Sequence, residues 1–171
     1  MEMYNLQHLG GWSIDRSCYD FILSILPKGS TILEFGSGFG TGYLSQDYNM
    51  ISVENNIDWI NRFNSNYIYA PIINYNSRNP APEGFEDQPA WYHRQPLEVI
   101  SDIKYDLILI DGPEGKYGRA GILQHLDLLN TNVPIIIDDI SRKAEFDLMT
   151  RLSEILNKPF TKLDWNTGYI L

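Results

Sequence analysis

Short runs of consecutive apolar residues alternate along the chain with stretches in which apolar residues recur every three or four positions. The runs 106–110 and 133–137 are almost wholly aliphatic, which is typical of strands buried on both faces of a parallel sheet. The stretches 15–26 and 142–156 have the period of an amphipathic helix instead. This alternation predicts an α/β fold, in which a doubly wound, mostly parallel sheet carries helices on both faces.

Seven strands account for this pattern. They are expected at 31–35, 50–53, 67–73, 106–110, 133–137, 160–163 and 168–171. The last two are joined through the turn-prone segment 166–168, so the sheet should finish with an antiparallel last strand. Shorter helical patterns should end near residue 48 and cover 57–63 and 119–129. Residues 74–95, rich in proline and polar residues, should form an irregular loop.

The composition narrows the class of protein. A length of 171 residues with 43% hydrophobic residues predicts one compact domain spanning 1–171. The formal net charge of −9 disfavours nucleic-acid binding, because an acidic surface repels phosphate backbones. The only cysteine of the sequence, Cys18, excludes an internal disulfide framework and suits a reducing cytoplasm.

Neither a membrane segment nor a leader is expected. A membrane helix needs about 20 apolar residues, and the sequence has no run of that kind. The first five residues lack the basic start and the apolar run of a signal peptide. We therefore expect a cytoplasmic protein without membrane or nucleic-acid partners. The sequence leaves the oligomeric state open, a homo-oligomer included.

A glycine-rich turn follows the first strand. It covers residues 36–42, with the sequence GSGFGTG, and stands where an open α/β sheet presents ligands. Because glycine has no Cβ, the backbone can turn tightly here and approach a ligand closely. Glu54, at the end of the second strand, comes eighteen residues after Gly36, a spacing that suits a carboxylate bound to two ribose hydroxyls. Together these features predict a cofactor site.

An acidic residue, Glu34, stands two places before a Gly-x-Gly-x-Gly run formed by Gly36, Gly38 and Gly40. This pattern resembles motif I of class I S-adenosylmethionine-dependent methyltransferases. The resemblance extends through Glu54 and the later strands over nearly the whole chain. It implies S-adenosylmethionine as the cofactor.

The resemblance also implies roles for single residues. Gly36, Ser37 and Gly38 should lie along the methionine portion of the cofactor. Glu54 should bind the ribose, and Glu34 should orient the loop or reach the cofactor amine.

Further cofactor contacts are expected from Asn55, Tyr92 and Asp111. The polar residues of 74–77 offer hydrogen-bonding groups for adenine, and Trp91 or Tyr92 could stack on its ring. The other interpretation of Trp91 and Tyr92 is an aromatic pair that anchors the long loop to the body of the protein.

Three carboxylates follow the strands 106–110 and 133–137. Asp111 comes directly after the first of these strands, and Asp138 and Asp139 after the second. Three oxygen ligands suit an octahedral Mg²⁺ ion, which could lower the pKa of a substrate hydroxyl. A strand-end Asp followed later by an Asp-Asp pair resembles the macrocin-type sugar O-methyltransferases. Alternatively, Asp111 contacts cofactor or substrate directly, Asp138 caps the next helix and Asp139 faces solvent.

Three other side chains have both a functional and a simpler interpretation. Lys116 could act as a base if burial lowers its pKa, or it is a solvated loop charge. Arg119 could bind an anionic substrate group, or it forms a salt bridge at a helix start. Trp12 could fold over the cofactor and exclude water, or it is a packed surface residue.

The leading hypothesis is an S-adenosylmethionine-dependent methyltransferase that acts on a small-molecule acceptor, a hydroxyl of a sugar or another polyhydroxylated metabolite. Asp111, with Lys116 or a metal ion, would help to generate the nucleophile. The acceptor class follows from the family likeness alone.

Two other classes of protein stay open. A nicotinamide-dependent oxidoreductase would favour G-x-G-x-x-G, whereas the sixth position here is Thr41, and the sequence has no clear catalytic Tyr and Lys spacing. A module that binds the cofactor without turnover, and that needs a partner to supply a substrate lid, is the third interpretation.

Overall fold

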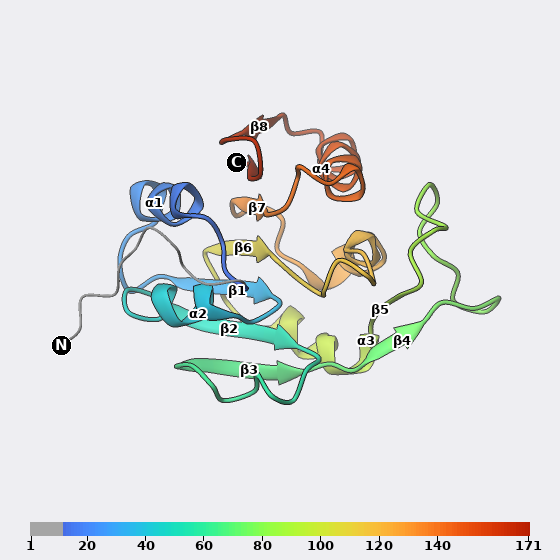
Figure 1. Cartoon of the computed structure of the whole chain (residues 1–171), viewed down its shortest axis with the longest axis horizontal. Helices are drawn as coiled ribbons and strands as arrows, with labels where there is room; N and C mark the ends of the chain where they lie inside the picture. Colours follow the sequence, from blue (N-terminus) through green and yellow to red (C-terminus); the bar gives the residue numbers. More distant parts are fainter. Residues whose placement is uncertain (1–11) are drawn as a thin grey trace.

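The computed structural model describes residues 12–171, so the prediction about a leader lies outside the described residues. A seven-stranded sheet forms its centre (Figure 1). The strands of this sheet are β1 (Thr31–Phe35), β2 (Asn49–Glu54), β3 (Ser65–Tyr69), β6 (Leu107–Ile110), β7 (Ile135–Ile137), β8 (Phe160–Lys162) and β9 (Gly168–Ile170). Their order across the sheet is β3-β2-β1-β6-β7-β9-β8.

The strand directions agree with the prediction. β9 runs antiparallel to both β7 and β8. The pairs formed by β3, β2, β1, β6 and β7 are all parallel. The predicted α/β fold, a seven-stranded and mostly parallel sheet with an antiparallel last strand, is therefore confirmed.

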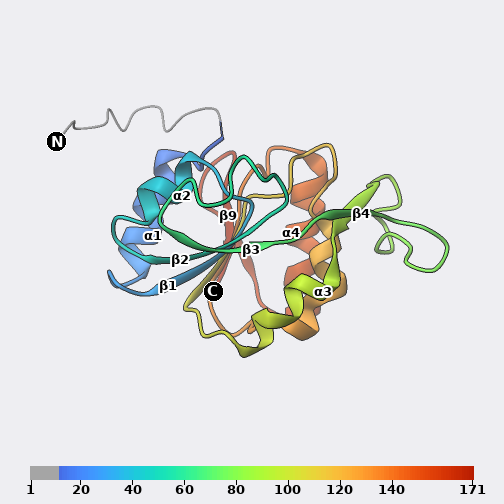
Figure 2. The ribbon, with the colours of Figure 1, turned by 90° about the horizontal axis from the view of Figure 1, so that it is seen from below.

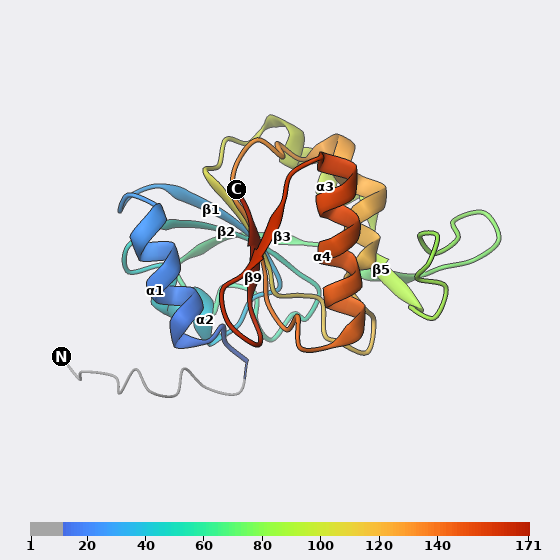
Figure 3. The ribbon, with the colours of Figure 1, turned by 90° about the horizontal axis from the view of Figure 1, so that it is seen from above.

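Helices cover both faces of the sheet (Figures 2 and 3). One face carries α1 (Arg16–Ile25) and α2 (Phe39–Leu44). The other face carries α3 (Arg94–Leu97), α4 (Lys143–Leu156) and two 3-10 helices, η1 (Glu98–Asp102) and η2 (Ala120–Leu128). No helix within residues 12–171 has the length and apolar character needed to cross a membrane.

The two helical layers explain why some strands of the sequence are continuous runs of apolar residues. Along a strand, successive side chains point to opposite faces of the sheet. Leu107 and Leu109 of β6 belong to the same core cluster as Ile22 of α1. Ile108 and Ile110 point to the opposite face and belong to the cluster that contains the apolar face of α4. A strand between two such layers has to be apolar at every position.

The segment 57–63 forms no helix, so that prediction was wrong. It consists of turns and bends between β2 and β3, and the side chain of Ile57 is 74% exposed. Asparagine competes with helical hydrogen bonding, since its short side chain binds nearby backbone groups. Here the Asn56 Oδ1 atom accepts a hydrogen bond from the Asp58 amide, and Asn61 has a left-handed φ of 60°.

The predicted strand 67–73 and the loop after it also differ from expectation. The strand divides at Pro71 into β3 and a second strand, β4 (Ile72–Asn74), which pairs antiparallel with β5 (Ala90–Tyr92). Proline cannot donate a ladder hydrogen bond, so it ends the pairing with the main sheet. Part of the expected irregular loop is therefore a two-stranded ribbon. The segment 119–129 is a 3-10 helix, η2, with non-helical dihedral angles at His125.

Candidate functional site

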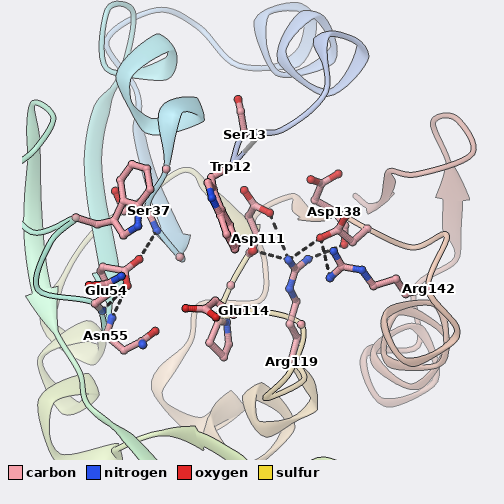
Figure 4. Close-up of a pocket in the computed structure, with 18 residues that line it drawn as sticks. Trp12, Ser13, Ser37, Glu54, Asn55, Asp111, Glu114, Arg119, Asp138 and Arg142 are labelled. Atoms are coloured by element: carbon pink, nitrogen blue, oxygen red, sulfur yellow. Dashed lines mark hydrogen bonds and ion pairs between the residues drawn. The ribbon is translucent and has the colours of Figure 1, made fainter. Parts of the chain in front are cut away.

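A cavity of about 470 Å³ opens at the carboxyl ends of β1, β2, β6 and β7 (Figure 4). These strands are parallel, so their carboxyl ends meet at one edge of the sheet, where this fold class binds ligands. Many residues that the sequence singles out line the cavity: Gly36, Ser37, Gly38, Glu54, Asn55, Asp111, Asp138 and Asp139.

The cavity has two chemically different halves. The glycine half is formed by Gly36, Ser37, Gly38, Glu54 and Asn55. The charged half is formed by Asp111, Arg119, Asp138, Asp139 and Arg142. Figure 4 shows the Ser37 and Glu54 side of the cavity opposite the Asp138 and Arg142 side.

Close packing fixes the glycine turn. Gly36 has a positive φ of 88°, and a Cβ placed on it would lie 2.7 Å from the Cα of Gly112. A Cβ placed on Gly38 would lie 2.1 Å from the carbonyl oxygen of Trp12. That same carbonyl accepts a hydrogen bond of 2.8 Å from the amide of Phe39. Larger residues at the two glycines would therefore push apart the backbone that forms the cavity.

Glu54 ties the end of β2 to this turn. Its Oε2 accepts a 2.7 Å hydrogen bond from the Ser37 amide. Its Oε1 accepts bonds of 2.7 Å and 2.6 Å from the amides of Asn55 and Asn56. Burial raises the pKa of Glu54, and these three backbone bonds oppose the increase. A carboxylate has about four acceptor positions, so Glu54 keeps capacity for a ligand hydroxyl.

Glu34 lies beneath the turn and does not line the cavity. Its Oε1 accepts hydrogen bonds of 2.7 Å from the Thr41 hydroxyl and 2.5 Å from the Ser52 hydroxyl. The Thr41 oxygen in turn accepts a bond from the Gly38 amide. Burial raises the pKa of Glu34 to about 7 against the lowering effect of the two hydroxyls. Of its two expected roles, this geometry matches orientation of the loop.

Tyr92 does not line this cavity, contrary to the prediction that it contacts a cofactor. Its side chain is 2% exposed and packs against Phe35 and Trp91 in the core. Both aromatic rings are buried in the same core cluster, which agrees with the anchor interpretation. No residue of 74–77 lines the cavity either.

Trp59 lines the same cavity as Glu54, and the sequence did not single it out. Its position five residues after the acidic strand end was the available signal. The false helical pattern at 57–63 hid that signal, because it assigned the neighbouring apolar residues to a helix face. Trp12 lines the cavity as well, as the covering interpretation requires.

The three predicted carboxylates converge. Asp111, Asp138 and Asp139 each offer an oxygen, and these oxygens lie within 4.8 Å of one another. Asp138 is buried, and its Oδ1 accepts hydrogen bonds of 3.1 Å from the Thr167 hydroxyl and 3.4 Å from the Asn166 amide group. Burial, and secondly the nearby Asp111 and Asp139, raise the pKa of Asp138. The interpretation in which Asp139 simply faces solvent was wrong, since it lines the cavity.

Arg119 is the buried cation of the charged half. Its side chain is 3% exposed, and its Nη2 lies 2.8 Å from Asp139 Oδ2 and 3.4 Å from Asp111 Oδ1. The exposed face of the cluster carries Arg142, whose Nη1 is 3.1 Å from Asp139 Oδ2. Arg119 therefore forms the salt bridge that the sequence allowed. Burial raises the pKa of Asp111, and Arg119 opposes the increase.

The carboxylates have the right donor atoms for a divalent cation, but the surrounding charges do not fit one. Two of the three carboxylates already pair with the guanidinium of Arg119, and Asp139 pairs with Arg142 too. Each guanidinium supplies the positive charge that a metal ion would otherwise bring. As arranged, the predicted metal site of Asp111, Asp138 and Asp139 is thus an ion-pair network.

Lys116 does not have the environment of a base with a lowered pKa. Its side chain is 61% exposed, and its Nζ lies 2.7 Å from Glu114 Oε2. The hydrogen bond to Glu114 raises the pKa of Lys116. The prediction of a buried lysine base was therefore wrong, because the loop after Asp111 turns Lys116 toward solvent. Glu114, its partner, lines the cavity instead.

No family model and no curated protein matches the sequence. Several solved structures do. A methyltransferase-like protein from Silicibacter pomeroyi has 15% sequence identity and a TM-score of 0.55, over 91% of this chain and 85% of that one. Aeropyrum pernix fibrillarin, with natively bound S-adenosyl-L-methionine, has 15% identity and a TM-score of 0.53, over 97% of this chain and 85% of that one.

A third similar structure is the MycE methyltransferase of the mycinamycin biosynthetic pathway, in complex with Mg and SAH. Its sequence identity is 12% and its TM-score 0.53, over 90% of this chain but 44% of that one. At such identities the likeness shows the fold alone. The chain has the class I methyltransferase fold.

Proposed function

We propose that the chain, which has the class I methyltransferase fold, is an S-adenosylmethionine-dependent methyltransferase with a small-molecule acceptor. The observation that carries this proposal is the hydrogen bond between the Ser37 amide and Glu54, which joins the glycine turn and the acidic end of β2 at one cavity. The acceptor group is a hydroxyl of a sugar or another polyhydroxylated metabolite. The net charge of −9 supports a small molecule over a nucleic acid.

The charge of the cavity supports S-adenosylmethionine over a dinucleotide. Its lining includes more carboxylates than guanidinium groups. The carboxylates are Glu54, Asp111, Glu114, Asp138 and Asp139, and the guanidinium groups are Arg119 and Arg142. S-adenosylmethionine is a net cation, because its sulfonium adds to an ammonium and a carboxylate that cancel, whereas a nicotinamide dinucleotide carries an anionic pyrophosphate. An acidic cavity attracts the first and repels the second.

The glycine half would hold the cofactor. The backbone of Gly36, Ser37 and Gly38 would follow the methionine portion, because these residues allow close approach. Glu54 would accept hydrogen bonds from the ribose hydroxyls with its remaining lone pairs. Asn55, next to Glu54 in the chain, offers a polar side chain for adenine. Trp59 would add an aromatic ring to the same cavity, and this ring is held by Arg62 and Phe63.

Asp111 would act at the acceptor. The bound cofactor supplies a methyl group on a sulfonium, which an acceptor oxygen takes up by in-line displacement as the carbon–sulfur bond breaks. Asp111 lies where the glycine half meets the charged half, and it would accept the proton that the hydroxyl loses. Trp12 would exclude water from this step. The products are a methyl ether, S-adenosylhomocysteine and a proton.

Calorimetric titration with S-adenosylhomocysteine, beside NAD at the same concentration, tests the cofactor class. We expect saturable binding of S-adenosylhomocysteine alone. Binding of NAD alone would overturn the proposal in favour of an oxidoreductase. A screen of hydroxylated acceptors by mass spectrometry then tests turnover. Tight cofactor binding without methyl transfer to any acceptor would replace the enzyme with a non-catalytic binding module.

A further inference from the structure

The charged half contains three carboxylates whose oxygens lie close enough together to bind a metal ion, yet a buried arginine stands among them. We propose that the guanidinium of Arg119 is the resident cation of the cluster of Asp111, Asp138 and Asp139, and that it excludes a divalent metal from this site. Arg119 thereby becomes the positioning residue for the carboxylate of Asp111.

Distances carry the first part of the inference. Arg119 Nη2 lies 2.8 Å from Asp139 Oδ2, while Mg²⁺ binds carboxylate oxygen at about 2.1 Å. An ion bound to that oxygen could lie no farther than about 5 Å from Nη2. Two cations at such a distance repel strongly in a site that is partly shielded from water. The guanidinium and a metal ion therefore compete for the same oxygens.

The backbone contacts of Arg119 show why it would not move aside. Its Nη1 donates a 2.8 Å hydrogen bond to the carbonyl oxygen of Asp138. Its Nη2 donates a 2.5 Å bond to the carbonyl oxygen of Asp111. The planar guanidinium thus joins the ends of β6 and β7. Displacing it would leave two backbone acceptors unpaired as well as the carboxylates.

One consequence concerns the reaction and rests on the proposed function. A fixed arginine holds the Asp111 carboxylate toward the cavity without help from a metal ion. Methyl transfer should then proceed at the same rate with and without a chelator. Metal binding itself can be measured without cofactor or acceptor, so it is independent of the proposed function.

The test is a titration of the purified 171-residue chain with Mn²⁺, in which electron paramagnetic resonance measures the free ion. Wild type is compared with Arg119→Gln, which removes the charge, and Arg119→Lys, which keeps it. Arg142→Gln is the matched control, because Arg142 contacts the same oxygen of Asp139 from a more exposed position. Thermal unfolding of each variant establishes that it is folded.

We expect Arg119→Gln to bind Mn²⁺ at least about ten-fold more tightly than wild type, because the buried positive charge, which water screens least, has left the cluster. Adding Asp139→Asn to this variant should abolish the gain. Arg119→Lys and Arg142→Gln should bind as weakly as wild type. A purely structural role of Arg119 would weaken the fold without creating a metal site.

Three results would overturn the inference. The first is Mn²⁺ binding by wild type that Asp139→Asn abolishes. This measurement does not depend on whether an Arg119 variant folds. The second is a folded Arg119→Gln that gains no affinity, with Arg119→Met as the replacement if it does not fold. The third is an equal gain in Arg119→Lys and Arg119→Gln. Failure to bind S-adenosylhomocysteine would instead contradict the proposed function and leave the Mn²⁺ result standing.

Discussion

The two halves of the cavity are built by different means. In the glycine half, backbone atoms form the walls, and Glu54 is held by three backbone amides. In the charged half, side chains that follow β6 and β7 or precede η2 hold one another through ion pairs, as Arg119 does with Asp111 and Asp139. A backbone held by close packing tolerates few substitutions, whereas an ion-pair network can accept other charged side chains or an ion. The fold therefore fixes the first half more strongly than the second.

The largest effect should follow from a Cβ in the glycine half. Gly36→Ala combines a φ of 88° with a contact of 2.7 Å to Gly112, so we expect S-adenosylhomocysteine binding to weaken by at least about 100-fold. Calorimetry measures this loss. Gly84→Ala is the matched control, because Gly84 has a φ of 87° and no atom within 4 Å of the added Cβ.

The control should lose only about 1 to 2 kcal/mol of unfolding free energy and bind the ligand as wild type does. If Gly36→Ala does not fold, Gly38→Ala tests the collision with the Trp12 carbonyl, without a positive φ. Unchanged ligand affinity in both glycine variants of the turn would contradict the assignment of the glycine half to the cofactor.

Asp111→Asn should separate the two halves kinetically. Loss of the proton acceptor should lower the methyl-transfer rate constant by about 100-fold. Binding of S-adenosylhomocysteine should change by less than about three-fold, because the glycine half is intact. Asp106→Asn is the control at the opposite end of the same strand, where the side chain accepts a hydrogen bond from the Thr31 amide. An equal loss of rate and affinity would show that Asp111 belongs to cofactor binding.

A smaller effect is expected from Glu54→Gln. The amide group replaces one acceptor oxygen with a donor that faces backbone N–H groups. The ligand affinity should fall by about ten-fold, since hydrogen bonds to a charged group contribute roughly 1.5 to 3 kcal/mol. Titration calorimetry gives the change directly. The rate constant at saturating cofactor should stay close to wild type; a large decrease in it would place Glu54 in the chemical step.

The smallest effect on ligand binding should come from Glu34→Gln, which instead alters the dependence of stability on pH. The pKa of Glu34 is about 7 in the fold, against an ordinary 4.5. Between these two values the folded state binds the proton more tightly than the unfolded state. The unfolding free energy should therefore fall as the pH rises from 4.5 to 7.

Urea unfolding from pH 5 to pH 8 measures this slope. The side chain introduced by Glu34→Gln is uncharged throughout, so this variant should lose roughly 1 to 3 kcal/mol less than wild type over that range. Asp111 and Asp138 also make the unfolding free energy depend on pH, in wild type and in the variant, because their pKa values are raised as well. Equal slopes in the two proteins would show that Glu34 does not titrate there.

Local patterns made the sheet and the glycine half predictable. The strand before Gly36, the turn itself and the acidic end of β2 are each short stretches of sequence with their own pattern. The charged half was predictable only as three strand-end carboxylates. Arg119 is eight residues from Asp111 and twenty from Asp139, so its pairing depends on which strand ends lie side by side.

The wrong predictions also have local causes. An apolar spacing at 57–63 matched a helix, but the side chain of Asn56 bonds the backbone in a turn, and Asn61 has a left-handed conformation. Tyr92 was assigned to the cofactor because a long loop was expected around it. It packs in the core against Phe35 and Trp91 instead. Both outcomes depend on contacts that a single-residue pattern does not encode.

The hydrogen bond from the Thr167 hydroxyl to Asp138 has a consequence for the order of events on the ribosome. A nascent chain emerges from its N-terminus, and its early segments can begin to fold first. The residues that form the glycine half, 36–55, are all synthesised before the first residue of the charged half, Asp111. Asp138 gains its partner only after residue 167 has been added. The charged half is therefore the last part of the cavity that translation can complete.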